Sequence, residues 1–121
     1  MVNILVVDDS PTYQAMVGEL LQRRGYACTY EDRGDSALAS AIKNQPDLIL
    51  MDVIMPGVSG FQATRQLTKN PQTAHIPVII ISTKDQETDR VWGLRQGARE
   101  YLVKTVSEDE LIATIEKVLK G

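Results

Sequence analysis

The chain has 121 residues, a formal net charge of -3 and a pI of about 5.1, which suits one domain with its own core. This acidic balance excludes a general basic field for nucleic acid or anionic lipid, so no nucleic-acid or membrane partner is expected. No apolar run is long enough to span a bilayer, and the first residues lack the pattern of a signal peptide. The single cysteine, Cys28, cannot form an internal disulfide, so a cytoplasmic location is expected.

Five strand patterns alternate with five helix patterns along the chain. Strands are predicted near residues 3–7, 27–31, 48–51, 78–81 and 99–103, and helices near 11–24, 36–43, 60–69, 86–96 and 108–119. Short loops between alternating elements predict parallel strands joined by right-handed crossovers. Three of the runs are nearly all apolar, as central strands are, whereas 27–31 alternates as an edge strand does. The sequence therefore predicts an α/β, flavodoxin-like (βα)5 three-layer sandwich with a five-stranded parallel sheet in the order 2-1-3-4-5.

Residues that favour helix starts and ends stand at the expected boundaries. Ser10, followed by proline, offers an N-cap hydroxyl for the first helix. Asp35 and Ser59 are predicted N-caps of the second and third helices, and Ser107 opens an acidic capping pattern for the last. Gly25 supplies the left-handed residue that ends the first helix.

Polar side chains follow four of the predicted strands at the points where the apolar runs stop. They are Asp8 and Asp9, then Asp52, then Ser82, and finally Lys104. Because the carboxyl ends of parallel strands meet at one edge of the sheet, these side chains are expected to gather in one cleft. Three carboxylates, a hydroxyl and an ammonium group there would suit a divalent cation and a phosphoryl group.

These residues together resemble the receiver domains of two-component response regulators, and the resemblance extends along the whole chain. The matching positions are Asp8-Asp9, Asp52, Met55-Pro56-Gly57, Gly60, Ser82, Gly93-Leu94, Gly97-Ala98, Tyr101 and Lys104. The resemblance implies one CheY-like receiver domain over residues 1–121 with no output domain, of the stand-alone type used in chemotaxis. Residues 89–98 are similar to the PilH/PilG type of regulator of type IV pilus twitching motility.

The resemblance also implies a role for each residue of the cleft. Asp52 would accept a phosphoryl group from a histidine kinase or a histidine phosphotransfer protein. Asp9, Asp52 and the backbone carbonyl of Ile54 would ligate Mg²⁺, with Asp8 acting through a water molecule. Lys104 would contact the phosphoryl oxygens. Such a protein is a phosphoacceptor switch that assists its own phosphorylation and dephosphorylation, and is not an enzyme acting on a separate substrate.

Ser82 and Tyr101 are the switch residues that the resemblance implies. A phosphoryl group would draw Ser82 toward it, and the ring of Tyr101 would turn into the vacated space. The surface of the fourth helix, fifth strand and fifth helix would then change its affinity for a downstream protein partner. Trp92 on this fourth helix is either a partner-binding residue or a cover for the edge of the core. The protein itself is expected to be a monomer or weak dimer.

The chain departs from the family pattern near the cleft. Thr105 stands where proline is usual, which leaves open a trans or a strained cis peptide after Lys104. Thr83 replaces a small residue and would narrow access to the phosphoryl group. Ile54 would hinder attacking water while Lys84 would attract the anion, so their effects on phosphoryl lifetime oppose each other.

Other function classes fit the sequence less well. A Mg²⁺-dependent phosphohydrolase with an aspartyl-phosphate intermediate would carry Asp-x-Asp after the first strand, where this chain has Asp8-Asp9-Ser10. A nucleotide- or flavin-binding module would carry a glycine-rich phosphate loop, and none follows the first strand. A pseudo-receiver that binds partners without phosphorylation is disfavoured by the intact acidic residues and Lys104. His75 stands alone, which favours a structural or solvent-exposed role.

Overall fold

The computed structural model describes residues 1–121 and confirms the alternation of strands and helices. The strands are β1 (Asn3–Val7), β2 (Ala27–Glu31), β3 (Leu48–Met51), β4 (Val78–Ser82) and β5 (Glu100–Val103). The helices are α1 (Pro11–Arg23), α2 (Ala37–Asn44), α3 (Gly60–Lys69), α4 (Glu87–Arg95) and α5 (Glu108–Lys120), with a short 3-10 turn, η1 (Gly34–Ser36), before α2. Every predicted boundary lies within one residue of the observed one.

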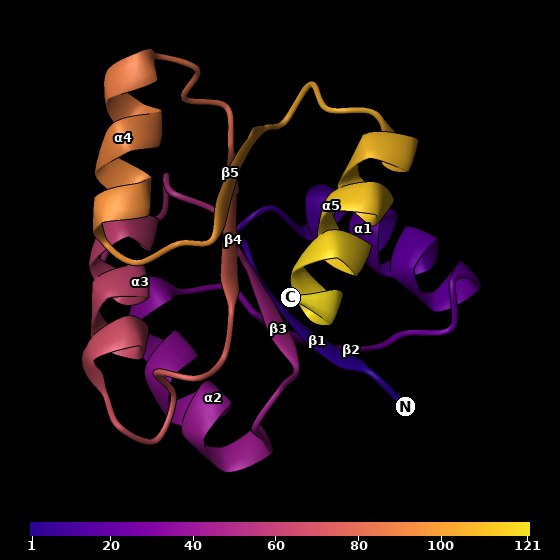
Figure 1. The fold of residues 1–121 in the computed structure, drawn as a ribbon, viewed down its shortest axis with the longest axis horizontal. Helices are drawn as coiled ribbons and strands as arrows, with labels where there is room; N and C mark the ends of the chain where they lie inside the picture. Colours follow the sequence, from indigo (N-terminus) through magenta and orange to yellow (C-terminus); the bar gives the residue numbers. More distant parts are fainter.

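The strands form a single parallel sheet in the order β2-β1-β3-β4-β5. Helices α1 and α5 cover one face of this sheet, while α2, α3 and α4 cover the other (Figure 1). The predicted flavodoxin-like three-layer architecture is therefore confirmed. The helices all fall short of the length and apolar character that crossing a membrane requires.

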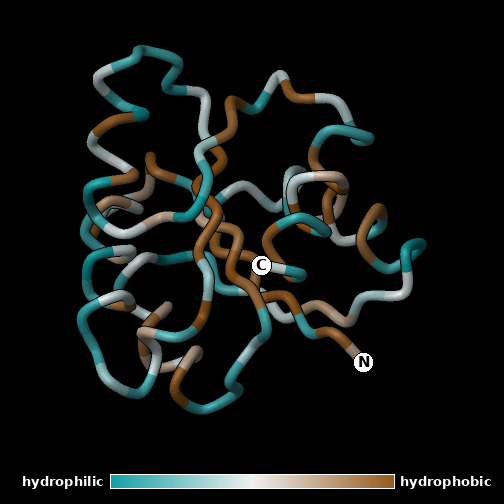
Figure 2. The backbone as a smooth tube through the Cα atoms, in the orientation of Figure 1, coloured by the Kyte–Doolittle hydropathy of each residue, from teal (hydrophilic) through white to brown (hydrophobic).

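Two separate hydrophobic clusters hold the layers together, one on each face of the sheet. Along β1, Leu5 and Val7 point into the cluster beneath α2 and α3, while Ile4 and Val6 point into the cluster beneath α1 and α5. Successive side chains of a strand face opposite sides, so a strand covered on both faces is apolar at every position. The hydrophobic colour accordingly runs along the central strands, and the outer helix surfaces are largely hydrophilic (Figure 2).

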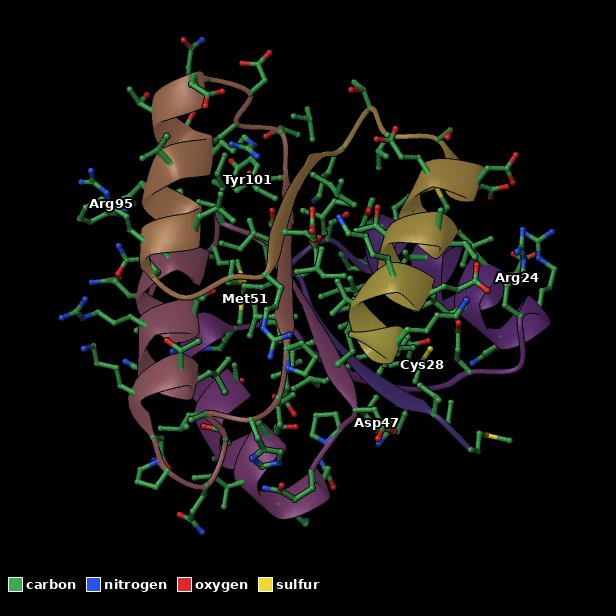
Figure 3. The ribbon with its side chains drawn as sticks, in the orientation of Figure 1. Arg24, Cys28, Asp47, Met51, Arg95 and Tyr101 are labelled. Carbon is green, nitrogen blue, oxygen red and sulfur yellow. The ribbon has the colours of Figure 1, made fainter.

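Strand β2 is the edge strand that its alternating sequence predicts. It pairs only with β1, and its residues are half-buried or exposed. Cys28 lies half-buried on this strand beside the cluster under α1 and α5, and it forms no disulfide. Its position in the sheet is shown in Figure 3.

Three of the predicted N-caps are confirmed by their hydrogen bonds. The Ser10 hydroxyl accepts a hydrogen bond from the backbone N–H of Tyr13 at 3.2 Å, which fixes the start of α1. Ser59 and Gln62 form a reciprocal capping box at the start of α3. The Ser107 hydroxyl accepts from the backbone N–H three residues further on, at 3.1 Å.

The predicted N-cap role of Asp35 is wrong. Helix α2 begins two residues later, at Ala37, and Asp35 lies in the 3-10 turn η1. The Asp35 carboxylate accepts two hydrogen bonds from the guanidinium group of Arg33, at 3.0 and 2.6 Å. A bidentate, charge-assisted pair of this kind competes successfully with a single bond to a helix N–H. At the end of α1, Gly25 adopts the predicted left-handed conformation, with φ +86°.

Candidate functional site

The sheet brings the predicted polar residues together at its carboxyl edge. Asp8 and Asp9 follow β1, Asp52 follows β3, Ser82 ends β4 and Lys104 follows β5. The hydrogen bonds of the sheet continue into these residues. Asp8 donates its N–H to a β2 carbonyl at 3.0 Å, Asp52 to a β1 carbonyl at 2.9 Å, and Lys104 to a β4 carbonyl at 2.8 Å. The backbone of the site is therefore held by the same interactions as the fold.

Three carboxylates form the acidic part of the site. Oxygen atoms of Asp8, Asp9 and Asp52 all lie within 4.8 Å of one another. Asp8 is 1% exposed and Asp52 is 5% exposed, whereas Asp9 is open to solvent. Buried carboxylates at this spacing repel one another. A set of hard oxygen donors with one open side is the environment that Mg²⁺ accepts, because Mg²⁺ retains several of its own water ligands.

Lys104 supplies the positive charge in the site. Its Nζ lies 2.8 Å from Oδ2 of Asp8 and 3.5 Å from Oδ1 of Asp52. The peptide bond between Lys104 and Thr105 is trans, as are all others in the chain. Of the two alternatives left open by the threonine at position 105, a trans or a strained cis peptide, the structure therefore has the trans form. Lys104 reaches both carboxylates from this trans arrangement. One ammonium group against three carboxylates leaves the cleft short of positive charge.

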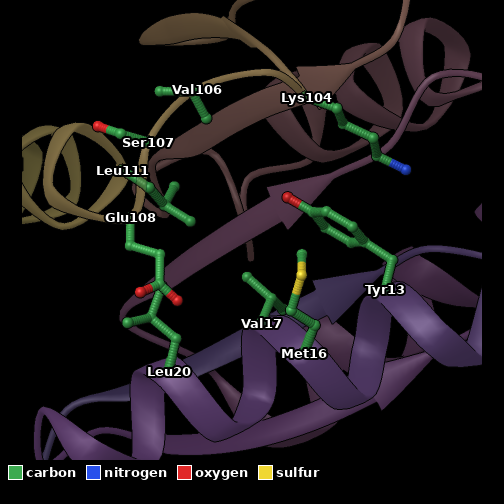
Figure 4. Close-up of a pocket in the computed structure, with 9 residues that line it drawn as sticks. All are labelled: Tyr13, Met16, Val17, Leu20, Lys104, Val106, Ser107, Glu108 and Leu111. Carbon is green, nitrogen blue, oxygen red and sulfur yellow. The ribbon is translucent and has the colours of Figure 1, made fainter.

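Tyr13 is a member of the site that the sequence prediction missed. The Nζ of Lys104 lies 4.2 Å from the centroid of the Tyr13 ring, within the range of a cation–π interaction. The two side chains approach each other from α1 and from the end of β5 (Figure 4). Burial, followed by the charges of Asp8 and Asp52, raises the pKa of Tyr13 to about 12. The available signal in the sequence is its position in the first turn of α1, shortly after the paired aspartates.

Among the three carboxylates of the cleft, Asp52 is the one whose negative charge is most disfavoured by its surroundings. Burial, followed by the negative charge of Asp8, raises the pKa of Asp52 from 3.8 to about 6. Lys104 and a hydrogen bond from the backbone of Val53 oppose this change and only partly offset it. An ionised Asp52 is therefore held in a site that disfavours its charge until a further cation arrives.

This raised pKa predicts a specific dependence of stability on pH in metal-free buffer. Between pH 3.8 and about 6 the folded chain retains a proton on Asp52 that the unfolded chain has lost. The contribution of this group to stability therefore falls as the pH rises through that window, by roughly 2 kcal/mol in total, which is less than the full shift because the cleft is open to solvent at Asp9. Asp52→Asn should remove this fall. The free energies of unfolding of the wild type and of Asp52→Asn are measured from pH 3.5 to 7 with a chelator present, and their difference at each pH gives the contribution of the Asp52 carboxyl group. Parallel curves for the two proteins would contradict the raised pKa.

Ser82 and Tyr101 both contact the backbone of Lys84. The buried Ser82 hydroxyl accepts a hydrogen bond from the Lys84 N–H at 3.1 Å. The Tyr101 hydroxyl donates to the Lys84 carbonyl at 2.7 Å, and its ring is buried between β5 and α4 (Figure 3). The ring thus already occupies the inward position in this structure, and the loop after β4 links the two predicted switch residues.

Gly93 leaves the space on α4 that the inward ring occupies. A Cβ atom at this position would lie 2.9 Å from Cδ2 of Tyr101 and 3.0 Å from Cδ1 of Ile80. The sequence prediction missed the close packing of the Tyr101 ring against Gly93, because this packing involves residues from three elements, α4, β5 and β4.

Gly93→Ala is expected to destabilise the protein by about 1 kcal/mol in denaturant unfolding, because crowding of the Tyr101 ring outweighs the higher helix propensity of alanine. In a Tyr101→Ala background the same change should instead be neutral or stabilising. Stabilisation of the otherwise wild-type chain by Gly93→Ala would contradict this account.

The remaining predicted residues lie around the rim of the site and on α4. Ile54 and Thr83 are exposed, and the Nζ of Lys84 lies 3.7 Å from a carboxylate oxygen of Asp89 on α4. Trp92 is 51% exposed, so half of its surface does not cover the core. The exposed His75 precedes β4, at the opposite edge of the sheet from the acidic cleft.

The fold and the cleft define a recognised class of signalling domain. Residues 4–116 match the response regulator receiver domain family, and the chain belongs to that family. It is 53% identical to the protein PilH of Pseudomonas aeruginosa over 121 residues, which cover 100% of both chains. Two other relatives are longer proteins. The chain spans about half of the phosphate regulon transcriptional regulatory protein PhoB of Pseudomonas aeruginosa and about a quarter of the response regulator PleD of Caulobacter vibrioides.

Solved structures show the same architecture. The chemotaxis protein CheY4 of Vibrio cholerae superposes with a TM-score of 0.90 and 32% identity, over 98% of each chain. The receiver domain of the sensor histidine kinase PA1611 from Pseudomonas aeruginosa superposes with a TM-score of 0.90 and 29% identity, also over 98% of each chain. That receiver domain holds a magnesium ion coordinated in its active-site cleft.

Proposed function

We propose that this chain is a phosphorylation-dependent switch of a two-component phosphorelay, with Asp52 as its phosphoacceptor. The observation that carries the proposal is the arrangement of Asp52 between two further aspartates and Lys104 at the carboxyl edge of the sheet. Membership of the receiver domain family supports the same role. The donor would be a phosphohistidine on a histidine kinase or a histidine phosphotransfer protein.

Each residue of the cleft has a chemical task in this reaction. A carboxylate oxygen of Asp52 attacks the phosphorus atom as the bond to the histidine nitrogen breaks. Mg²⁺, held by Asp9, Asp52 and the backbone carbonyl of Ile54, with Asp8 acting through a water molecule, would neutralise charge on the transferring group. Lys104 contacts the phosphoryl oxygens, and the Ser82 hydroxyl donates a hydrogen bond to them. The same cleft assists the later hydrolysis of the aspartyl phosphate.

The output of the switch is a change in affinity for a protein partner in the cytoplasm. Loss of the hydrogen bond between Ser82 and the Lys84 backbone would free the loop after β4, and the Tyr101 ring, which is already inward in this structure, would then be held in that position. The exposed Trp92 on α4 is the residue that we expect to contact the partner. Similarity to PilH along its full length supports a single-domain regulator of type IV pilus twitching motility. We expect a monomer or a weak dimer.

Chemical trapping would test the proposed phosphoacceptor directly. The protein is incubated with acetyl phosphate and Mg²⁺, and the acyl phosphate is then reduced with borohydride, which converts a phosphorylated aspartate to homoserine. Peptide mass spectrometry should find homoserine at position 52. Homoserine at another position would contradict the assignment, and steady turnover of a free phosphoester would instead favour a phosphohydrolase.

A further inference from the structure

One carboxylate joins the start of α1 to the lysine of the site. Oδ1 of Asp8 accepts a hydrogen bond from the backbone N–H of Ser10 at 2.8 Å, and the Ser10 hydroxyl accepts from the N–H of Tyr13 at 3.2 Å. Oδ2 of Asp8 accepts from Nζ of Lys104 at 2.8 Å. The same Nζ atom lies over the ring of Tyr13, 4.2 Å from its centroid, so these contacts form a closed ring that leads from Asp8 through α1 and back to Lys104.

The ring faces an ammonium group that is also paired with the Asp8 carboxylate, 2.8 Å away, and lies 3.5 Å from that of Asp52. Lysine carries its charge on a flexible four-carbon stem, so its position depends on what surrounds the stem and the charge. The Lys104 side chain is 18% exposed. A small hollow of about 40 Å³ lies beside the pair, between α1 and the loop before α5, and Tyr13 and Lys104 both line it (Figure 4). Without the ring this hollow would widen, and the stem could swing away from the carboxylates.

We propose that Tyr13 is a positioning residue for phosphoryl transfer, whose ring face holds the Lys104 ammonium between Asp8 and Asp52. This inference rests on the proposed function and adds to it a residue that contacts the phosphoryl group only through Lys104. The ring face makes the interaction, and the hydroxyl is not needed for it. Phenylalanine should therefore replace Tyr13 without loss, whereas an aliphatic side chain of similar size should not.

Rates of phosphoryl uptake from acetyl phosphate at saturating Mg²⁺ test this role. Tyr13→Phe should retain the wild-type rate within about twofold, while Tyr13→Leu should be slower by about 3- to 10-fold, the range expected for a partly buried cation–π contact. In a Lys104→Ala background, Tyr13→Leu should cause no further loss, because its effect acts through the lysine. A wild-type rate in Tyr13→Leu, or an equal loss with and without Lys104, would overturn the proposal.

A second measurement needs no phosphodonor. Protons lying over an aromatic ring resonate upfield, so the ε-methylene signal of Lys104 should be shifted upfield in the wild type and in Tyr13→Phe, and should return to its ordinary position in Tyr13→Leu. An unshifted signal in the folded wild type would overturn the contact itself. Absence of phosphoryl uptake by the wild type would contradict the proposed function. Normal uptake by both the wild type and Tyr13→Leu would contradict only the role of Tyr13.

Discussion

Asp52→Asn is expected to abolish phosphoryl uptake while making the protein more stable. The amide cannot replace the carboxylate oxygen that would attack phosphorus, so uptake should fall at least about 100-fold, as it does when a covalent nucleophile is lost. The same change removes the negative charge of a buried carboxyl group, whose pKa is raised to about 6 because the site disfavours that charge. The free energy of unfolding at pH 7 without metal should therefore rise by roughly 2 kcal/mol.

A surface acid provides the matched control for this variant. The Asp109 side chain is 97% exposed on the first turn of α5, so Asp109→Asn should leave uptake unchanged and alter the free energy of unfolding by less than about 0.5 kcal/mol. Mg²⁺ should stabilise the wild type and Asp109→Asn, but should stabilise Asp52→Asn much less. Full uptake by Asp52→Asn, measured by intact mass, would contradict the assignment of the phosphoacceptor.

Gly60→Ala is expected to have the largest effect on stability of any single methyl group near the site. A Cβ atom at this position would overlap the Asp52 carbonyl oxygen, and it would lie 2.7 Å from the carbonyl carbon of Asp52 and 2.8 Å from Cα of Val53. These neighbours are backbone atoms at the end of β3, so no flexible side chain can move aside. The first turn of α3 would have to shift, at a cost of about 3 kcal/mol in the free energy of unfolding. Because the same shift displaces Asp52, phosphoryl uptake should also slow.

Gly57 is the control that separates crowding from backbone conformation. It has φ +76° with no atom within 4 Å of the position of an added Cβ. Gly57→Ala should therefore cost only the strain of a left-handed residue, about 1 to 2 kcal/mol, and should leave uptake close to normal. Denaturant unfolding of the two variants gives the comparison. A Gly60→Ala protein as stable as Gly57→Ala would contradict the close packing of α3 against the end of β3.

The features that the sequence predicted well depend on local patterns and simple topology. Apolar runs that stop at Asp8, Asp52 and Lys104 mark the ends of strands, and parallel strands place those ends at one edge. The strand order followed from the contrast between fully apolar strands and the alternating strand β2. The position of the acidic cluster is therefore predictable from the sequence alone.

The features that were missed depend on contacts between elements that are distant in the sequence. The position of Tyr13 in the first turn of α1 indicates that it lies near the paired aspartates, but not that its ring faces Lys104 after β5, because that contact depends on how α1 packs. The space that Gly93 leaves for Tyr101 likewise exists only after α4 has packed against β5. The error at Asp35 had the opposite origin, since its neighbour Arg33 offered a stronger partner than the helix N–H. Propensity rules do not include such competing side-chain pairs.

The most direct test of the central claim is the intact mass of the wild-type protein after incubation with acetyl phosphate, with and without Mg²⁺. A working receiver should gain one phosphoryl group, about 80 Da, only when Mg²⁺ is present. The gained mass should disappear on treatment with hydroxylamine, which cleaves acyl phosphates. No gain in mass at saturating donor and Mg²⁺, or a gain that does not depend on the metal, would contradict the proposal that the acidic cleft is a magnesium-dependent phosphoacceptor site.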